Sequence, residues 1–252
     1  QSRATIPVVS IGNIVAGGTG KTAFVKKLSE DLCTFGKIFI LSRAYRSLVE
    51  KRRESLHLTK QSKVTPEVCG DEVYMLFNSL QGVDFLIGKD RLLGMEQALK
   101  KGADLIVLDD GMQYRRLHRD LEVVMLHADD LYGNGYFLPR GYLRESPKRL
   151  EKADVLVIHH VKEKGQFQAI QKEVAKYSRA PIIGTKMGSL HIRMSKEEKL
   201  HSLKGKRVGV FCGLGSPSSF LKTTKEMGAD IIETMILPDH IAPSRKKLNM
   251  FS

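Results

Sequence analysis

Residues 5–22, Thr-Ile-Pro-Val-Val-Ser-Ile-Gly-Asn-Ile-Val-Ala-Gly-Gly-Thr-Gly-Lys-Thr, decide how the rest of the chain is interpreted. An apolar strand, a glycine-rich loop and a helix that opens with Gly-Lys-Thr follow one another in the order of a P-loop. The amides of such a loop and the positive end of the helix dipole bind phosphate oxygens. This stretch therefore predicts a nucleotide-binding site, whose expected contacts are Gly17, Gly18, Thr19, Gly20, Lys21 and Thr22.

Two residues of this loop have more specific expected roles. Lys21 is expected at the β- and γ-phosphates, and the Thr22 hydroxyl is expected to hold Mg²⁺. The strict pattern has a glycine at position 15, where this chain has Val15, so the loop is a variant. The alternative is a glycine-rich turn that only connects a strand to a helix, but the Gly-Lys-Thr ending after an apolar run favours the P-loop.

Strands and helices alternate along the remaining sequence, which predicts βαβ units and a mostly parallel sheet. The expected fold is α/β, a P-loop NTPase-like sheet flanked by helices with a smaller C-terminal α/β lobe. We expect the core domain over residues 1–180 and the smaller lobe over 181–252. The basic segment 43–63 is expected to be an exposed loop or ribbon, and residues 127–152 are expected to be irregular.

The composition points to an anionic partner. The net charge is +13 over 252 residues, which suits a nucleic acid, a phosphorylated substrate or an anionic membrane surface. No run approaches the roughly 18 apolar residues of a membrane-spanning helix. The three cysteines are widely separated, which argues against a disulfide framework or zinc site and predicts reduced thiols in the cytoplasm.

A second motif, Leu105-Ile-Val-Leu-Asp109-Asp110-Gly111-Met-Gln113, has the pattern of a Walker B strand. A carboxylate at the carboxyl end of a strand beside a P-loop can ligate Mg²⁺ directly or through water. The alternative is an ordinary Asp-Gly turn after a buried strand. The presence of the P-loop favours a metal site that includes Asp109, Asp110 and Thr22.

Two further motifs are ambiguous from spacing alone. Gly70-Asp71-Glu72 precedes an expected helix, where acidic residues commonly complement the helix dipole without any catalytic role. Pro238-Asp239-His240 contains a histidine in an expected loop, and such a residue is usually not catalytic. Neither motif is assigned a function on these grounds.

Nine short motifs together resemble the tetraacyldisaccharide 4'-kinase family of lipid A biosynthesis, in the family's order and over nearly the whole chain. They are Gly12-Asn13 with Gly17–Thr22, Leu41-Ser-Arg43-Ala-Tyr45, Gly70-Asp-Glu72, Asp90-Arg91, Asp109-Asp-Gly-Met-Gln113, Gly133-Asn-Gly135 with Leu138-Pro139, Leu143-Arg-Glu145, Phe211-Cys-Gly213 and Pro238-Asp-His240. The Val15 variant of the P-loop is also similar to the family's own version. The family usually has glycine where this chain has Ala44. The resemblance therefore does not determine the backbone conformation of that loop.

The resemblance implies ATP- and Mg²⁺-dependent phosphorylation of the 4'-hydroxyl of a tetraacylated glucosamine disaccharide 1-phosphate. It implies a peripheral enzyme on the cytoplasmic face of the bacterial inner membrane, with no nucleic-acid partner; the family's N-terminal membrane helix is absent from these residues. It makes Asp71 the catalytic base, paired with His240, and Asp110 the magnesium-linked acid. The resemblance places the following residues around the phosphates or the lipid headgroup: Arg43, Tyr45, Glu72, Arg91, Asp109, Gln113, Arg144 and Glu145.

Two other functional classes remain as alternatives. A nucleotide-dependent switch is one, although a GTPase would carry a guanine-reading Asn-Lys-x-Asp motif, which this sequence lacks. A nucleic-acid-binding module is the other, and only the charge favours it. Aromatic residues make up 7% of the chain and include no tryptophan, which offers little surface for base stacking.

Overall fold

The computed structural model describes residues 1–186, 192–193, 199–213 and 217–238. The chain divides into two compact units, Gln1–Lys186 and Met187–Ser252. The larger unit contains the P-loop and the Asp-Asp-Gly motif, and the fold is described for each unit separately.

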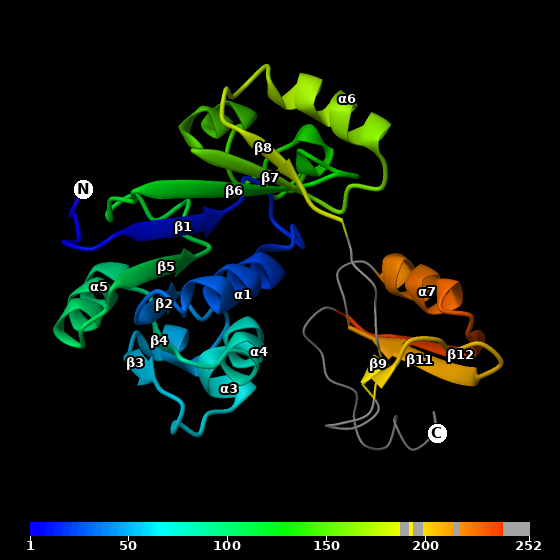
Figure 1. Ribbon diagram of the computed structural model, residues 1–252, viewed down its shortest axis with the longest axis horizontal. Helices are drawn as coiled ribbons and strands as arrows, with labels where there is room; N and C mark the ends of the chain where they lie inside the picture. Colours follow the sequence, from blue (N-terminus) through cyan, green and yellow to red (C-terminus); the bar gives the residue numbers. More distant parts are fainter. Residues whose placement is uncertain (187–191, 194–198, 214–216, 239–252) are drawn as a thin grey trace. The chain divides into compact units, whose positions relative to one another are not determined.

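The larger unit is built on an eight-stranded sheet in the order β3-β4-β2-β5-β1-β6-β7-β8 (Figure 1). Only the pair β3–β4 is antiparallel among these strands, so the prediction of a mostly parallel sheet is confirmed. The strands are β1 (Val8–Gly12), β2 (Ile38–Ser42), β3 (Ser55–Leu58), β4 (Val83–Gly88), β5 (Leu105–Asp109), β6 (Leu121–His127), β7 (Val155–His159) and β8 (Ile182–Gly184).

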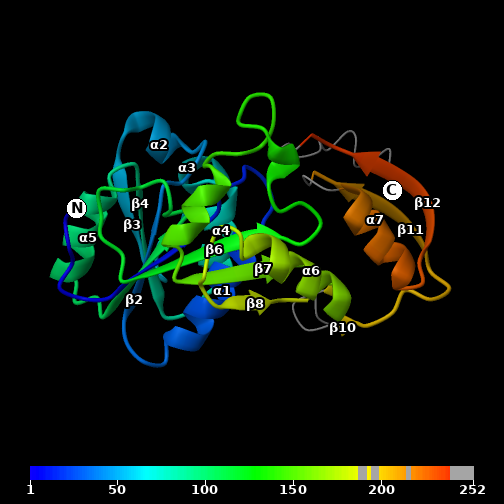
Figure 2. The ribbon, with the colours of Figure 1, turned by 90° about the horizontal axis from the view of Figure 1, so that it is seen from above.

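Helices cover both faces of this sheet (Figures 1 and 2). Val25 and Leu76 pack with Ile40 on one face, whereas Met95 and Ala98 pack with Phe39 on the other. The alternation arises because successive side chains of a strand point to opposite faces. The helices are α1 (Lys21–Leu32), α2 (Leu48–Arg52), α3 (Pro66–Cys69), α4 (Asp71–Ser79), α5 (Arg91–Lys100) and α6 (Lys164–Val174), with 3₁₀ turns η1 (Gly133–Gly135) and η2 (Pro147–Lys152).

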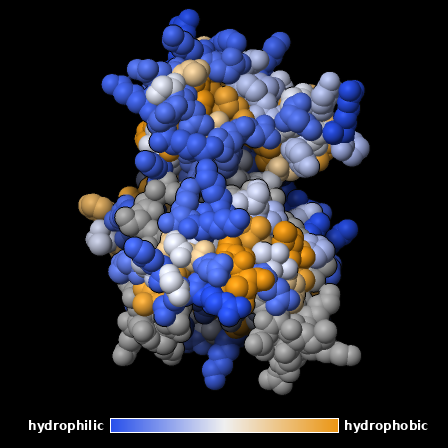
Figure 3. All heavy atoms as spheres, turned by 90° about the vertical axis from the view of Figure 1, so that its right-hand side faces the viewer, coloured by the Kyte–Doolittle hydropathy of each residue, from blue (hydrophilic) through white to orange (hydrophobic). Residues whose placement is uncertain are grey.

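Helix α6 is amphipathic and closes one end of the core. Ile170 and Val174 are buried against the strands β6 and β7. Its other side is polar, and hydrophilic residues predominate in the upper part of Figure 3, where this helix lies.

Strand β1 positions the functional site. All five of its residues are buried, and it lies between β5 and β6 in the sheet. Because β1, β5, β6 and β7 are parallel, their carboxyl ends meet at one edge, where open α/β sheets bind ligands. The P-loop and the Asp-Asp-Gly motif both emerge at that edge.

The prediction of an exposed loop or ribbon over 43–63 was wrong in part, since α2 and β3 lie within it and bury Val49 and Leu58. The Ser47 hydroxyl accepts a hydrogen bond from the Glu50 amide and so caps α2. Strand β3 pairs with β4 as an antiparallel edge strand and buries Leu58. Both elements are very short, so the surrounding basic residues obscured their patterns in the sequence.

The smaller unit contains β11 (Arg207–Cys212) paired in parallel with β12 (Asp230–Ile236) and joined to it through α7 (Pro217–Glu226). A second antiparallel pair consists of β9 (Ile192–Arg193) and β10 (Lys199–Leu200). The predicted boundary at residue 180 precedes β8, which pairs with β7, so the larger unit extends to Lys186. The division into functional domains stays a prediction. Within the described residues, no helix combines the length and apolar character needed to cross a membrane.

Candidate functional site

The P-loop has free space over its glycines, and its last residues are held by a hydrogen bond and by the start of α1. An added Cβ at Gly17 or Gly18 would have no heavy atom within 4 Å, so space is available over the loop. Gly20 adopts the left-handed conformation at φ 81° and caps α1, which begins at Lys21. The side chain of Thr19 is buried and accepts a hydrogen bond from Asn13 Nδ2 at 2.9 Å.

Val15, the residue that departs from the strict motif, anchors a distant segment to the P-loop. It is buried and forms an isolated antiparallel bridge with Leu143. The Ala16 amide donates to the Tyr142 carbonyl at 2.7 Å, and the Arg144 amide donates to the Ile14 carbonyl at 2.8 Å. The irregular region predicted over 127–152 is therefore tied to the loop by backbone hydrogen bonds, which bring Arg144 into the site.

Asp110 is the point where the P-loop and this segment meet. Its Oδ1 lies 3.6 Å from Lys21 Nζ and 2.9 Å from Arg144 Nη1. Burial alone would raise the pKa of this carboxyl, but Lys21, Arg144 and Arg91 outweigh it and hold the pKa below its usual range. Asp110 is therefore ionised and paired with cations at neutral pH.

The pKa of Asp109 is shifted in the opposite direction, upward. It is 4% exposed, and its Oδ2 accepts a hydrogen bond from Ser42 Oγ at 2.8 Å. Burial, reinforced by the nearby charges of Glu72 and Asp110, raises the pKa of Asp109 to about 6. Adjacent carboxyl groups with opposite pKa shifts are typical of functional sites.

A cavity of about 460 Å³ adjoins Asp110 and is predominantly basic. Among the residues that line it are six Lys or Arg and two Asp: Arg43, Arg53, Lys89, Arg91, Arg116, Arg144, Asp90 and Asp110. Tyr114 and Gln113 complete the lining. A concave surface with this excess of positive charge suits a phosphorylated ligand.

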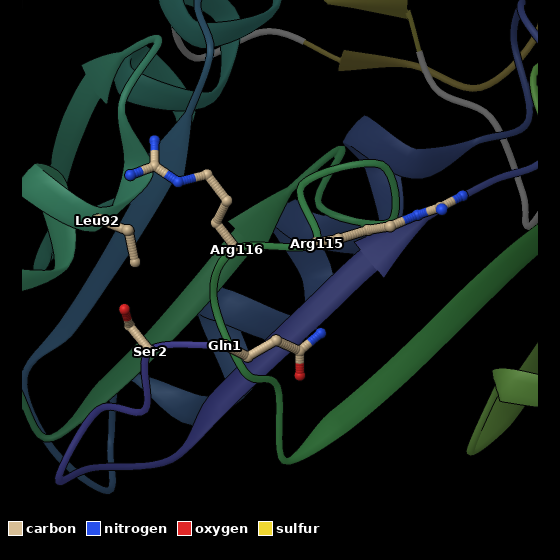
Figure 4. Close-up of a pocket in the computed structure, with 5 residues that line it drawn as sticks. All are labelled: Gln1, Ser2, Leu92, Arg115 and Arg116. Atoms are coloured by element: carbon tan, nitrogen blue, oxygen red, sulfur yellow. The ribbon is translucent and has the colours of Figure 1, made fainter.

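A second, more open hollow of about 590 Å³ lies beside it and shares Arg116 (Figure 4). Its other lining residues are Gln1, Ser2, Leu92 and Arg115. Figure 4 shows Arg115 and Arg116 pointing in different directions. Arg115 is paired with Glu145 at 2.9 Å, and Arg116 lies 3.8 Å from Asp90. This hollow contacts neither the P-loop nor Asp110, so we place the site in the smaller basic cavity.

The residues expected near the substrate that accepts the phosphate lie on two neighbouring segments, the start of α4 and the turn after β2. Asp71 and Glu72 begin α4 directly after Gly70, whose added Cβ would lie 3.2 Å from the Tyr45 carbonyl oxygen. Tyr45 is 61% exposed, and the guanidinium carbons of Arg43 and Arg46 lie 6.0 and 5.3 Å from the centroid of its ring. The structure thus brings the start of α4 against the Arg43–Arg46 turn. His240 lies outside the described residues.

Ala44, where the resemblance leads one to expect glycine, has a positive φ of 54°. This left-handed conformation favours glycine, and the alanine is also buried. The chain therefore keeps at Ala44 the left-handed backbone that a glycine would adopt most readily.

The oxygen-rich side chains at the carboxyl ends of β1 and β5 fit Mg²⁺. Asp109 and Asp110 supply carboxylates, Thr22 supplies a hydroxyl, and the buried Gln113 Oε1 has no hydrogen-bond partner among the described residues. No group of three or more His, Cys, Asp or Glu side chains forms a preassembled metal site in the described part of the chain. Mg²⁺ commonly uses one or two carboxylates together with substrate phosphates, so the donor set suits an ion that arrives with a nucleotide.

Sequence reasoning missed the role of Asn13. This fully buried residue connects three parts of the site: Nδ2 donates to Thr19, Oδ1 accepts from Arg144 at 3.2 Å, and the carbonyl accepts from Gln113 Nε2 at 3.0 Å. Its place in the Gly12-Asn13 motif was the signal that could have identified it. Three cationic lining residues, Arg53, Lys89 and Arg116, belonged to none of the motifs and were also missed.

Comparison with known proteins agrees with this geometry. The family model described as tetraacyldisaccharide-1-P 4'-kinase, LpxK, matches residues 1–252. A tetraacyldisaccharide 4'-kinase of Chlamydia abortus is 37% identical over 99% of this chain and 68% of its own length. The enzyme of the same name from Halothermothrix orenii is 34% identical over 92% and 65% of the two lengths.

The solved structures include a close match in fold. A crystal structure of LpxK from Aquifex aeolicus in complex with ATP is 32% identical, with a TM-score of 0.75. The match covers 97% of this chain and 76% of that one. On the match to the full family model and on these relatives, the chain belongs to the tetraacyldisaccharide-1-P 4'-kinase family.

Proposed function

We propose that this chain transfers the γ-phosphate of ATP to the 4'-hydroxyl of a tetraacylated glucosamine disaccharide 1-phosphate, a step of lipid A biosynthesis. The observation that carries the proposal is the meeting of Lys21 and Arg144 at one oxygen of Asp110. Two cations at the edge of a basic cavity support the proposal, because phosphoryl transfer requires charge neutralisation.

Charge neutralisation and positioning account for most of the catalysis of phosphoryl transfer. The amides of Gly17 to Gly20 and Lys21 bind the phosphates of ATP, while Arg144 and Arg91 offset the charge that develops on the transferred group. Mg²⁺, when held by Asp109, Asp110 and Thr22, supplies further charge neutralisation at the phosphates. Asn13 keeps the P-loop and Arg144 in register through its two side-chain hydrogen bonds.

The acceptor side is assigned to the start of α4. Asp71 accepts the proton of the sugar hydroxyl as that oxygen attacks the γ-phosphate, and His240 orients Asp71. General-base assistance of this kind contributes about 10²–10⁴-fold to the rate. Glu72 and Gln113 position the phosphates or the sugar, with Glu145 behind them in its ion pair with Arg115.

The lipid substrate requires access from a membrane surface, and two exposed segments suit that role. Tyr136, Phe137 and Leu138 form an exposed apolar tip, and the Arg140 guanidinium lies 3.8 Å from the Tyr136 ring centroid. The ring of the exposed Tyr45 likewise has guanidinium groups near it, those of Arg43 and Arg46. Aromatic rings next to basic side chains suit the interface of an anionic bilayer. We place these segments at the cytoplasmic face of the inner membrane.

Membrane contact is tested by liposome sedimentation at low and high salt. Arg140→Glu is expected to weaken binding to anionic vesicles at least about five-fold, because each basic residue near such a surface contributes about 1 kcal/mol. Lys176→Glu, a charge reversal in the turn that follows α6, is the matched control. Equal binding by wild type and Arg140→Glu would exclude this surface.

The activity itself is tested with γ-labelled ATP and the disaccharide 1-phosphate lipid in mixed micelles. Label is expected in the lipid at the 4'-position, and not in water-soluble phosphate alone. Asp110→Asn should lose transfer while it retains its fold, as judged by circular dichroism. Labelled inorganic phosphate without labelled lipid would instead support a nucleotide-dependent switch.

A further inference from the structure

The three histidines at the ends of β6 and β7 are not explained by phosphate binding or by the acceptor site. His127 ends β6, His159 ends β7, and His160 follows directly. The ring centroids of His127 and His160 are 5.3 Å apart in a stacked arrangement, and those of His159 and His160 are 5.9 Å apart. In the described part of the chain, they belong to no group that could hold a metal ion.

This cluster contacts the P-loop at Gly20. A Cβ added at Gly20 would lie 2.6 Å from His159 Cδ2, so the imidazole packs directly on the residue that caps α1. Asp110 follows β5, on one side of β1 in the sheet, whereas β6 and β7, which carry the histidines, lie on the other side of β1. A γ-phosphate bound at Lys21 and Arg144, which both pair with Asp110, would leave the β6 and β7 side for the ribose and base.

His160 has the features of a residue held for binding. It adopts a left-handed φ of 69°, a conformation that is uncommon outside glycine and is found at functional sites. Its side chain is 28% exposed, and its buried Nδ1 makes no hydrogen bond among the described residues but lies 3.8 Å from Asp129 Oδ2. Packing alone gives no reason for a polar, strained residue at this position.

The two histidines next to His160 have lowered pKa values and are neutral at neutral pH. Burial, together with the neighbouring histidines, lowers the pKa of His159. Burial and His160 likewise lower the pKa of His127. The nearby Lys162 is paired with both oxygens of Asp129, at 2.7 and 2.8 Å. A neutral aromatic surface suits stacking with a nucleobase, which is flat and uncharged.

We propose that His160 stacks on the nucleobase of the nucleotide bound at the P-loop, and that His159, whose ring packs on Gly20, positions the His160 ring beside the loop. The inference rests on the proposed function, because it assumes that the P-loop binds ATP. It adds the part of the site that recognises the base, on β6 and β7, to the part on β1 and β5 that handles the phosphates.

The test compares two probes by calorimetry: ATP and inorganic tripolyphosphate, which has no base. His160→Gly removes the ring at a backbone conformation that glycine adopts readily. It is expected to weaken ATP binding about ten-fold and to change tripolyphosphate binding less than about two-fold. His160→Phe, which keeps an aromatic face, should retain ATP affinity within about three-fold.

Steady-state kinetics provide a second readout. His160→Gly should raise KM for ATP with kcat and KM for the lipid unchanged. His118→Ala is the matched control, because this histidine lies before the amino end of β6 and contacts Asp120 instead. It should change neither ATP nor tripolyphosphate binding.

The outcomes separate the two proposals. If wild type binds ATP and His160→Gly binds it equally well, the nucleobase role is wrong and the proposed function stands. Equal losses for both probes would show that the substitution distorts the P-loop, and they would also overturn the nucleobase role. If wild type binds neither probe, the proposed function fails and this inference fails with it.

Discussion

Replacing Asp109 with asparagine should stabilise the folded protein at neutral pH while it abolishes phosphate transfer. The side chain is buried and its Oδ2 accepts a hydrogen bond from Ser42 at 2.8 Å. Asparagine is nearly isosteric and can still accept that hydrogen bond through Oδ1. The substitution therefore removes a buried charge without opening a cavity or leaving Ser42 without an acceptor.

The expected gain in the free energy of unfolding follows from the pKa of Asp109, which is raised from its usual 3.8 to about 6. One pKa unit corresponds to about 1.4 kcal/mol, so the ionised group costs the folded state about 3 kcal/mol. Because the folded state holds the proton more tightly than the unfolded chain, this group favours folding at low pH. That contribution is complete below about pH 3.8 and is lost as the pH rises through about 6.

The assay is urea unfolding of wild type and Asp109→Asn over a range of pH. The variant should be more stable by about 3 kcal/mol at pH 8 and by only about 1 kcal/mol at pH 4.5. At pH 8 this corresponds to a rise in Tm of roughly 6–12 °C for a chain of this size. Asp31→Asn, at an exposed position in α1, is the control and should show no comparable gain.

The pH dependence is what tests the reasoning. A gain in stability that is the same at pH 4.5 and pH 8 would mean that the pKa of Asp109 is not raised. A variant that is less stable than wild type at pH 8 would mean that hydrogen bonding to the carboxylate outweighs its burial. Either result would refute the physical account of this site.

Three further substitutions test other parts of the site. Asn13→Ala removes one neutral and one charge-assisted hydrogen bond, so urea unfolding should show a loss of about 2–4 kcal/mol together with lower kcat/KM. Gly12→Ala places a Cβ 2.4 Å from Met112 Cβ and should destabilise by about 1–3 kcal/mol. Its control, Gly165→Ala in α6, meets no atom within 4 Å and should stabilise slightly. Asp71→Ala should reduce kcat at least about 100-fold with little change in KM for ATP, and turnover at the wild-type rate would contradict its assignment as the base.

The sequence was sufficient for most of the larger unit because its signals are local. Alternating strands and helices predict the parallel sheet, and the apolar spacing of Phe24, Val25, Leu28 and Leu32 predicts the buried side of α1. Segment 43–63 was misjudged because α2 and β3 are stabilised by one cap and one edge pairing. Neither contact leaves a period in the sequence that is long enough to detect.

Sequence spacing predicted the positions of site residues only where they come directly after a strand. Asp109 and Asp110 could be placed at the edge of the sheet from the apolar run before them. Spacing alone could not place Arg144, which only the family resemblance assigned to the site, because its approach depends on backbone hydrogen bonds that join Ile14 and Ala16 to a segment without periodicity. Val15 is an example. It departs from the P-loop pattern, yet its bridge to Leu143 holds the next residue, Arg144, where it pairs with Asp110.

The Asp-Asp-Gly-x-Gln motif has a physical explanation at each position. Asp109 remains in β5 and is buried beside Ser42, whereas the left-handed φ of 51° at Asp110 ends the strand. The Asp110 carboxylate meets Lys21 and Arg144. A Cβ at Gly111 would lie 2.5 Å from Ser10 Oγ, so only glycine fits there without displacement. Gln113 then donates to the Asn13 carbonyl at 3.0 Å and joins the motif to the P-loop. The backbone turn thus gives two adjacent carboxyl groups opposite environments, one desolvated and one paired with cations, and this difference raises one pKa and lowers the other.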